Sequence, residues 1–210
     1  MEKYYNETLG KEFASKVSLL KQQLRTQEFN PEKSTFGISG STFRAFKDCK
    51  VPPSKVYQDW AKSTTKRLFE SQKIPNLSSQ IEFDNWHIGV IDSFKTFWER
   101  EQGEERIFAH TYKVVDLYIK WLSSLKECPK QLCDGILKFG YCALDSQILI
   151  KLNECLSGAL PIRNPSMGDI SNRNTYDFCQ TLIEGFCVKY GGTRLLFDYF
   201  AWKPGGSSQR

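Results

Sequence analysis

The chain of 210 residues is long enough to bury one sizeable hydrophobic core and short for two, since domains hold roughly 100–200 residues. Hydrophobic residues make up 40% of it and aromatic residues 14%, which excludes a chain that is disordered throughout. The formal net charge of +5 is uneven, because residues 1–80 hold 14 Lys or Arg against 8 Asp or Glu, whereas residues 81–210 hold 15 against 16. We therefore expect a single domain over residues 1–203, with a basic N-terminal part (1–80) and a core part (81–203).

The distribution of apolar residues and cysteines bears on the cellular compartment. No uninterrupted apolar stretch approaches the roughly 18 residues that span a bilayer, and the first 25 residues are charged rather than signal-like. The seven cysteines are odd in number, and the close pair Cys128 and Cys133 has no second pair to complete a zinc site. These features predict a cytoplasmic protein in a reducing environment, with no membrane span, metal or cofactor.

The first 80 residues contain two amphipathic helical patterns. One apolar stripe predicts a surface helix over residues 7–26, and after a Pro-, Ser- and Gly-rich break Ser41 or Thr42 is suited to cap a short helix that ends near residue 47. Pro52 and Pro53 then interrupt the chain, and residues 54–72 form a second basic helical pattern.

The middle of the chain has the strongest helical periodicity. Apolar spacing predicts two helices within residues 83–126, separated near Gly103, and the second has apolar residues on two faces, which is typical of a central buried helix. A short helix follows Pro129, and Asp145 is placed to be the N-cap of a helix that ends at Leu156.

Beyond Leu156, the pattern becomes irregular. Residues 157–172 read as a long loop, a candidate lid or binding loop, before another helix that Gly191 and Gly192 close after Tyr190. Residues 195–202 are so uniformly apolar that periodicity does not distinguish helix from strand, although we expect them to be buried. Residues 204–210 read as a frayed, disordered tail. The chain is therefore predicted to be an all-α domain of about seven helices.

The basic N-terminal part contains a candidate anion site. A turn followed by a short helix offers free backbone N–H groups, hydroxyls and a guanidinium, which together suit a phosphate, although the spacing is not that of an ATP-binding P-loop. The next helix adds further cations that are candidates for contact with DNA or RNA phosphates. The alternatives are an ordinary capped helix and a solvated basic face. The residues concerned are Gly40, Ser41, Thr42, Arg44, Lys62, Lys66 and Arg67.

Arg106 and His110 are a second candidate, because residues four apart share one face of a helix. A cationic Arg beside an imidazole is a pairing that RNA-cleaving helical domains use, although the spacing here is one residue shorter than in the HEPN-type nuclease motif. A catalytic role competes with a role for His110 in helix packing.

Asp145 is the third candidate. The string from Leu144 to Ile148, followed by an amphipathic helix, resembles about 30 residues of the helix-hairpin-helix base-excision DNA glycosylases, in which an aspartate follows an apolar residue and precedes Ser or Thr. The resemblance implies an all-helical fold, a base flipped into a pocket, and an aspartate that supports departure of the damaged base. Residues 126–138 lack the family's Gly-rich hairpin, while Lys130 and Lys138 lie near the place where bifunctional members carry a lysine nucleophile. The alternative role of Asp145 is that of a helix cap alone.

Two functional hypotheses follow from these patterns. One is a nucleic-acid-associated helical protein, in its sharpest form a glycosylase-like enzyme. The other is a non-catalytic accessory or immunity-type subunit that docks a protein partner through aromatic residues. Because aromatic residues that stack on bases must be exposed, Tyr4, Tyr5 and Trp202 are the ones whose exposure matters most.

Overall fold

The computed structural model describes residues 2–71, 74–161 and 164–202. Within these residues the chain forms eight α-helices and three short 3-10 helices and no β-sheet, which confirms the all-α prediction. The predicted tail at 204–210 lies outside the described residues. The helices are α1 (Glu7–Lys21), α2 (Pro53–Glu70), α3 (Gln80–Gln102), α4 (Phe108–Ser124), α5 (Lys130–Phe139), α6 (Ser146–Cys155), α7 (Arg173–Lys189) and α8 (Arg194–Ala201), with 3-10 helices η1 (Glu2–Tyr4), η2 (Gly40–Ala45) and η3 (Met167–Asp169).

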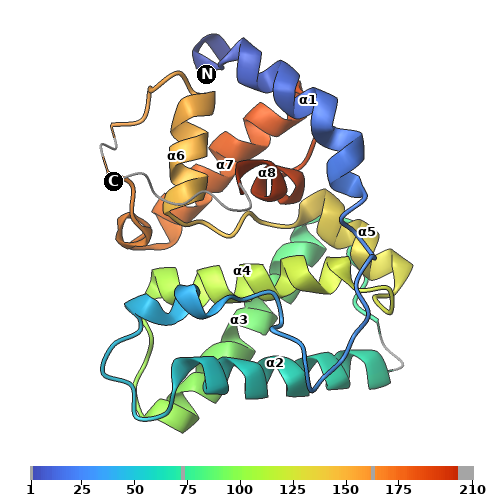
Figure 1. The fold of residues 1–210 in the computed structure, drawn as a ribbon, viewed down its shortest axis with the longest axis vertical. Coiled ribbons are helices and arrows are strands. Elements are labelled where there is room, and N and C mark those ends of the chain that lie inside the picture. Colours follow the sequence, from blue (N-terminus) through green and yellow to red (C-terminus); the bar gives the residue numbers. More distant parts are fainter. Residues whose placement is uncertain (1, 72–73, 162–163, 203–210) are drawn as a thin grey trace.

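The helices fall into two groups (Figure 1). The first group contains α2, α3, α4 and η2, and the second contains α1, α6, α7 and α8. Helix α5 contacts α3 and α4 of the first group and α8 of the second, so it joins the two. Trp60, Trp98 and Tyr118 fill the centre of the first group, while Phe186 and Phe197 fill that of the second, and all are at most 1% exposed.

Helix α4 is central and mostly buried, as its two apolar faces predicted. Lys113, Leu117 and Lys120 are among its few half-buried residues, and their spacing of four and three places them on one face of the helix. This face lies toward the second group of helices, so two cations sit between the two halves of the molecule.

Two predicted boundaries near the N-terminus were wrong. Helix α1 ends at Lys21 rather than near residue 26, because the backbone N–H of Arg25 donates to the Ser123 carbonyl (3.0 Å), which holds the chain beside the end of α4. The short helix η2 is of the 3-10 type and has Ser39 at its N-cap position, instead of Ser41 or Thr42.

The C-terminal half follows its prediction closely. Asp145 is the N-cap of α6, and most of the described residues between α6 and α7 lack regular structure apart from η3. The ambiguous segment 195–202 proves to be helix α8, buried along most of its length. None of the helices in the described ranges combines the length and apolar character that crossing a bilayer requires. All seven cysteines are free thiols, and six of them are buried.

Candidate functional site

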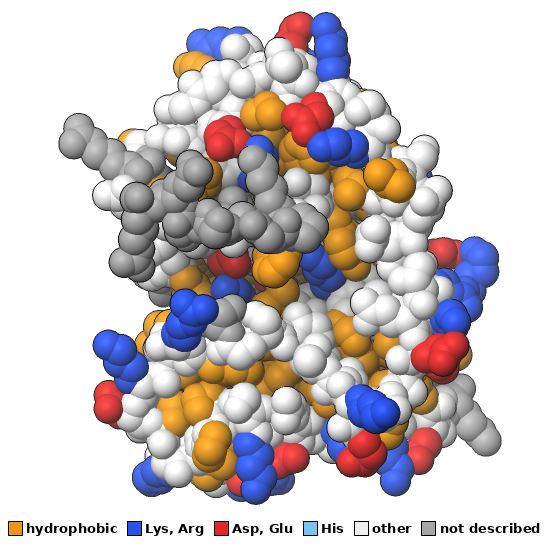
Figure 2. Space-filling model, in the orientation of Figure 1, with side chains coloured by type: hydrophobic (Ala, Val, Ile, Leu, Met, Phe, Trp, Pro, Cys, Tyr) orange, Lys and Arg blue, Asp and Glu red, His pale blue; other side chains and the backbone are white. Residues whose placement is uncertain are grey.

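A recess with two adjoining chambers lies between the two groups of helices. The chambers have volumes of about 190 and 200 Å³, and both are lined by Gly37, Leu117 and Trp202. The half-buried face of α4 therefore borders both. Figure 2 shows the hollow near the middle of the molecule, with hydrophobic, basic and acidic side chains at its edges. We call this recess the inter-group cleft.

The first chamber contains Asp145. One carboxylate oxygen, Oδ1, accepts hydrogen bonds from the backbone N–H groups of Gln147 (2.9 Å) and Ile148 (3.1 Å), as expected of an N-cap. The other oxygen, Oδ2, lies 3.2 Å from Nζ of Lys113, and the two side chains are only 17% and 14% exposed. Thr42 lines the same chamber. Asp145 therefore caps its helix and also faces a cleft that holds a lysine.

The second chamber is more aromatic and contains a second Lys–Asp pair. Trp121, Tyr199 and Trp202 line it together with Lys120, whose ammonium forms an ion pair with Asp198 of α8. The ammonium also lies 4.1 Å from the centre of the Tyr199 ring. Burial acts to lower the pKa of Lys120, but the Asp198 carboxylate outweighs it, so that the pKa lies above its ordinary value. Lys120 is thus held as a cation at the chamber wall.

The predicted anion site is only partly connected with this cleft. Thr42 lines the first chamber, whereas Arg44 is exposed on η2 and a side chain at Gly40 would meet open space. The side chain of Ser41 lies outside what the structure describes. Anion binding by these residues stays a prediction.

The basic residues of α2 lie elsewhere. Lys62 pairs with Glu32 (2.5 Å), Lys66 lies 3.8 Å from Glu70, and Arg67 donates to Thr64 (3.4 Å). Helix α2 is on the far side of α4 from α6 (Figure 1), so the structure does not bring these cations together with Asp145. Their contact with phosphates stays a prediction.

Arg106 and His110 do meet, but not on one face of a helix as predicted, because α4 begins at Phe108 and Arg106 lies before its N-cap residue, Ile107. Nε of Arg106 donates to Nδ1 of His110 at 3.2 Å, and the His110 ring stacks on Phe46 with ring centres 4.3 Å apart. Burial, with the charges of Arg106 and Lys113, lowers the pKa of His110 to about 4, so the ring is neutral at pH 7 and can accept the bond. Neither Arg106 nor His110 lines a chamber of the inter-group cleft, and a catalytic role for them stays untested.

Lys130 and Lys138 also lie apart from Asp145. They line a shallow pocket of about 500 Å³ between α5 and residues 76–78, and Lys130 pairs with Asp134 on the same exposed helix face. Neither lysine lines the inter-group cleft.

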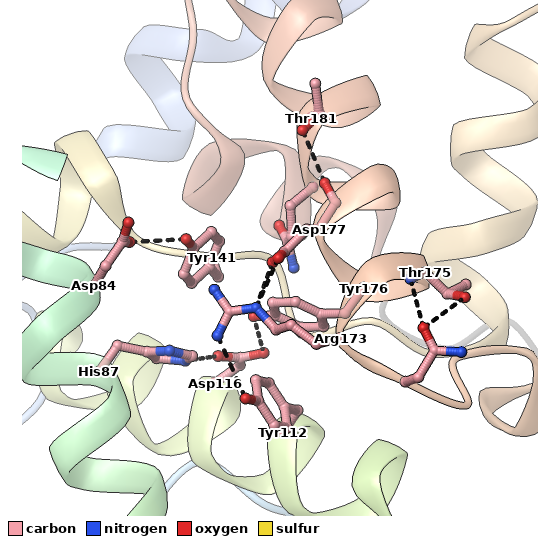
Figure 3. Close-up of polar contacts among 12 residues, drawn as sticks. Asp84, His87, Tyr112, Asp116, Tyr141, Arg173, Thr175, Tyr176, Asp177 and Thr181 are labelled. Atoms are coloured by element: carbon pink, nitrogen blue, oxygen red, sulfur yellow. Dashed lines mark hydrogen bonds and ion pairs between the residues drawn. The ribbon is translucent and has the colours of Figure 1, made fainter. Parts of the chain in front are cut away.

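A buried polar network that the sequence did not reveal links the two groups of helices (Figure 3). Nε2 of His87 on α3 lies 2.7 Å from Oδ1 of Asp116 on α4, and the hydroxyl of Tyr176 on α7 donates to Oδ2 of Asp116 at 2.9 Å. Burial raises the pKa of Asp116, while the bond to His87 opposes that rise. His87, Asp116 and Tyr176 line neither chamber of the inter-group cleft nor the pocket beside α5, and their bonds join α3 and α4 to α7, so we interpret them as a brace between the groups.

Sequence reasoning identified Asp145 but missed its partner Lys113 and the neighbouring Lys120–Asp198 pair. Lys113, Lys120 and Asp198 lie in strongly apolar helices, and the available signal was that two lysines seven residues apart interrupt an otherwise buried helix. Of the aromatic residues whose exposure mattered, Tyr4 (46%) and Trp202 (48%) are exposed, whereas Tyr5 is buried.

In the part of the chain that the structure describes, no three His, Cys, Asp or Glu side chains gather in a way that could hold a metal ion. No protein-family model, curated protein or solved structure matches the chain.

Proposed function

We propose that this protein binds DNA and removes a base from it, with the target nucleotide in the inter-group cleft and Asp145 beside the bond that breaks. The observation that carries the proposal is that Asp145 turns its second carboxylate oxygen to Lys113 at the cleft wall, rather than bonding only to N–H groups of its own helix. A cap alone needs one oxygen and no partner on another helix.

Hydrolysis of an N-glycosidic bond makes demands that Asp145 is placed to meet. The C1′–N bond breaks with its electron pair leaving on the base, so positive charge develops on the sugar, and water then adds to C1′ while the base takes up a proton. A carboxylate near C1′ stabilises that charge and accepts a proton from the attacking water. The low exposure of Asp145 strengthens this interaction, because the surrounding dielectric is lower than that of water.

The second chamber suits the flipped base. A hollow of roughly 150 Å³ accepts benzene, so that one of about 200 Å³ has room for a base ring. Trp121, Tyr199 and Trp202 offer aromatic surfaces, and stacking of a base on such rings contributes about 1–3 kcal/mol. Lys120 has N–H donors beyond the one that Asp198 accepts, which favours a base with a carbonyl oxygen at the edge that enters.

The test is a strand-cleavage assay for abasic sites, on duplex and single-stranded oligonucleotides that each carry one modified base. Asp145→Asn keeps an N-cap side chain but removes the carboxylate, so we expect normal folding with at least a hundredfold lower rate, roughly the contribution of one acid–base group. The control is Asp134→Asn, which makes the same change in net charge and breaks a Lys–Asp pair outside the cleft. Equal rates for wild type and Asp145→Asn would exclude a catalytic Asp145.

DNA binding itself is tested by fluorescence anisotropy at increasing salt concentration. Phosphate contacts release counterions, so affinity must fall as salt rises. If α2 contributes contacts, replacing Lys62, Lys66 and Arg67 by Gln reduces the magnitude of the salt slope by about 3. Absence of binding at low salt would overturn the proposal and favour the alternative, a non-catalytic subunit that docks a protein.

A further inference from the structure

The residues just before Asp145 are held at three backbone groups by two buried side chains. Gln180 of α7 accepts the backbone N–H of Cys142 (3.0 Å) through Oε1 and donates to the Cys142 carbonyl (2.8 Å) through Nε2. Asp198 of α8 accepts the backbone N–H of Ala143 at 2.7 Å. Gln180 and Asp198 are each 1% exposed, so none of the three bonds competes with bulk water.

These bonds act on the geometry of Asp145 through a short stretch of backbone. A planar peptide leaves two soft dihedral angles per residue, so few angles separate the fixed peptides of Cys142 and Ala143 from the Asp145 side chain. The intervening Leu144 is itself only 3% exposed, which restricts those angles further. Resting on the function proposed above, we propose that Gln180 is a positioning residue that sets the place of the Asp145 carboxylate in the inter-group cleft.

Gln180 is the better residue to test, because Asp198 also pairs with Lys120 in the second chamber. Two reporters of the Asp145 position are independent of activity. The backbone N–H groups of Gln147 and Ile148 lie in the first turn of α6, where no helical carbonyl is available, and both donate to Oδ1 of Asp145. Their hydrogen-exchange rates, measured by NMR, therefore report whether the carboxylate is in place.

Gln180→Leu has a similar volume and removes both bonds to Cys142. We expect exchange at Gln147 and Ile148 to quicken by about fivefold beyond any global change, which corresponds to about 1 kcal/mol, the size of a cap. The matched control is Thr65→Val, which removes a buried hydrogen bond to Tyr118 (2.9 Å) in the first group of helices and should leave these two amides unaffected.

Gln180→Glu keeps the test decisive if Gln180→Leu does not fold. A protonated carboxyl group accepts from the Cys142 N–H and donates to its carbonyl, as the amide does, whereas the ionised form has no donor. Burial raises the pKa of a carboxyl group, so this variant should match wild-type exchange at low pH and lose protection at Gln147 and Ile148 as pH rises. Unchanged exchange in the folded variants, or equal effects of Thr65→Val, would overturn the positioning role.

The activity readout separates this inference from the proposed function. With a substrate, Gln180→Leu should lower kcat by about tenfold and change KM by less than about twofold, because it misplaces a group without removing binding contacts. A kcat that is unchanged in the folded variant would also overturn the inference. A wild-type protein without base excision would refute the proposed function, while the exchange rates would still decide whether Gln180 positions Asp145.

Discussion

Replacing Asp198 by Asn should destabilise the protein by an amount that its surroundings allow us to work out. The Asp198 side chain is 2% exposed and that of Lys120 is 16% exposed, so the substitution strands an ammonium in a largely dry place. Breaking a buried pair on one side costs about 3–5 kcal/mol. Asn retains an oxygen for the Ala143 N–H, and Lys120 borders the second chamber, so we expect the lower end, about 3 kcal/mol. For a chain of this size that corresponds to a fall in Tm of about 6–12 °C.

The pH dependence of this loss has a defined sign. In the wild type the pKa of Lys120 is raised from 10.5, so its pairing stabilises the fold fully below that value, and this stabilisation is lost as pH rises through the folded-state pKa. In Asp198→Asn the carboxylate that outweighs burial is gone, so burial lowers the pKa of Lys120 and the variant gains stability relative to the wild type as pH rises. The difference between the two should therefore shrink from pH 7 to pH 10.

Urea unfolding followed by circular dichroism measures these quantities, and a double variant provides the control. Lys120→Met together with Asp198→Asn removes the stranded charge and should recover at least half of the loss. A loss below about 1 kcal/mol for Asp198→Asn, or a double variant that loses the sum of the two single losses, would refute the argument that an unpaired buried charge is the cause.

Two further predictions concern stability away from the cleft. The pKa of His110 is lowered from 6.5 to about 4, so between those pH values His110 binds a proton in the unfolded chain but not in the folded one, and the free energy of unfolding falls as pH falls, by at most about 1.4 kcal/mol per pH unit. His110→Phe should flatten that slope in urea titrations from pH 4 to 7. An unchanged slope would contradict the assignment. Gly10→Ala should lower the free energy of unfolding by more than about 2 kcal/mol, because the new Cβ would lie 2.0 Å from the Tyr190 ring. A Cβ at Gly89 meets nothing within 4 Å, so Gly89→Ala should stabilise α3 by about 0.5–1 kcal/mol. Thermal melts of the two variants check this contrast, and similar Tm values would contradict it.

Local interactions explain what the sequence by itself determined. The helical spacing of apolar residues predicted the principal helices, and the residue type of Asp145 predicted its role as N-cap, because both depend on residues within a turn or two of one another. Asp145 was likewise proposed from sequence as a candidate for chemistry. Arg106 and His110 were expected to share a helix face, which was wrong, because Arg106 lies before the N-cap residue of α4 even though its side chain reaches His110.

Only the tertiary structure decided what surrounds Asp145. Lys113 is separated from Asp145 by the rest of α4, by α5 and by the loops on either side of α5. Lys120 pairs with Asp198 across 78 residues of sequence, and Gln180 binds Cys142 across 38. Pairs so distant in the chain leave no periodic signal, since each helix only shows which of its faces is buried and not what packs on it. The same limit explains the error at the end of α1, where bonds to the distant end of α4 outweigh local helical preference.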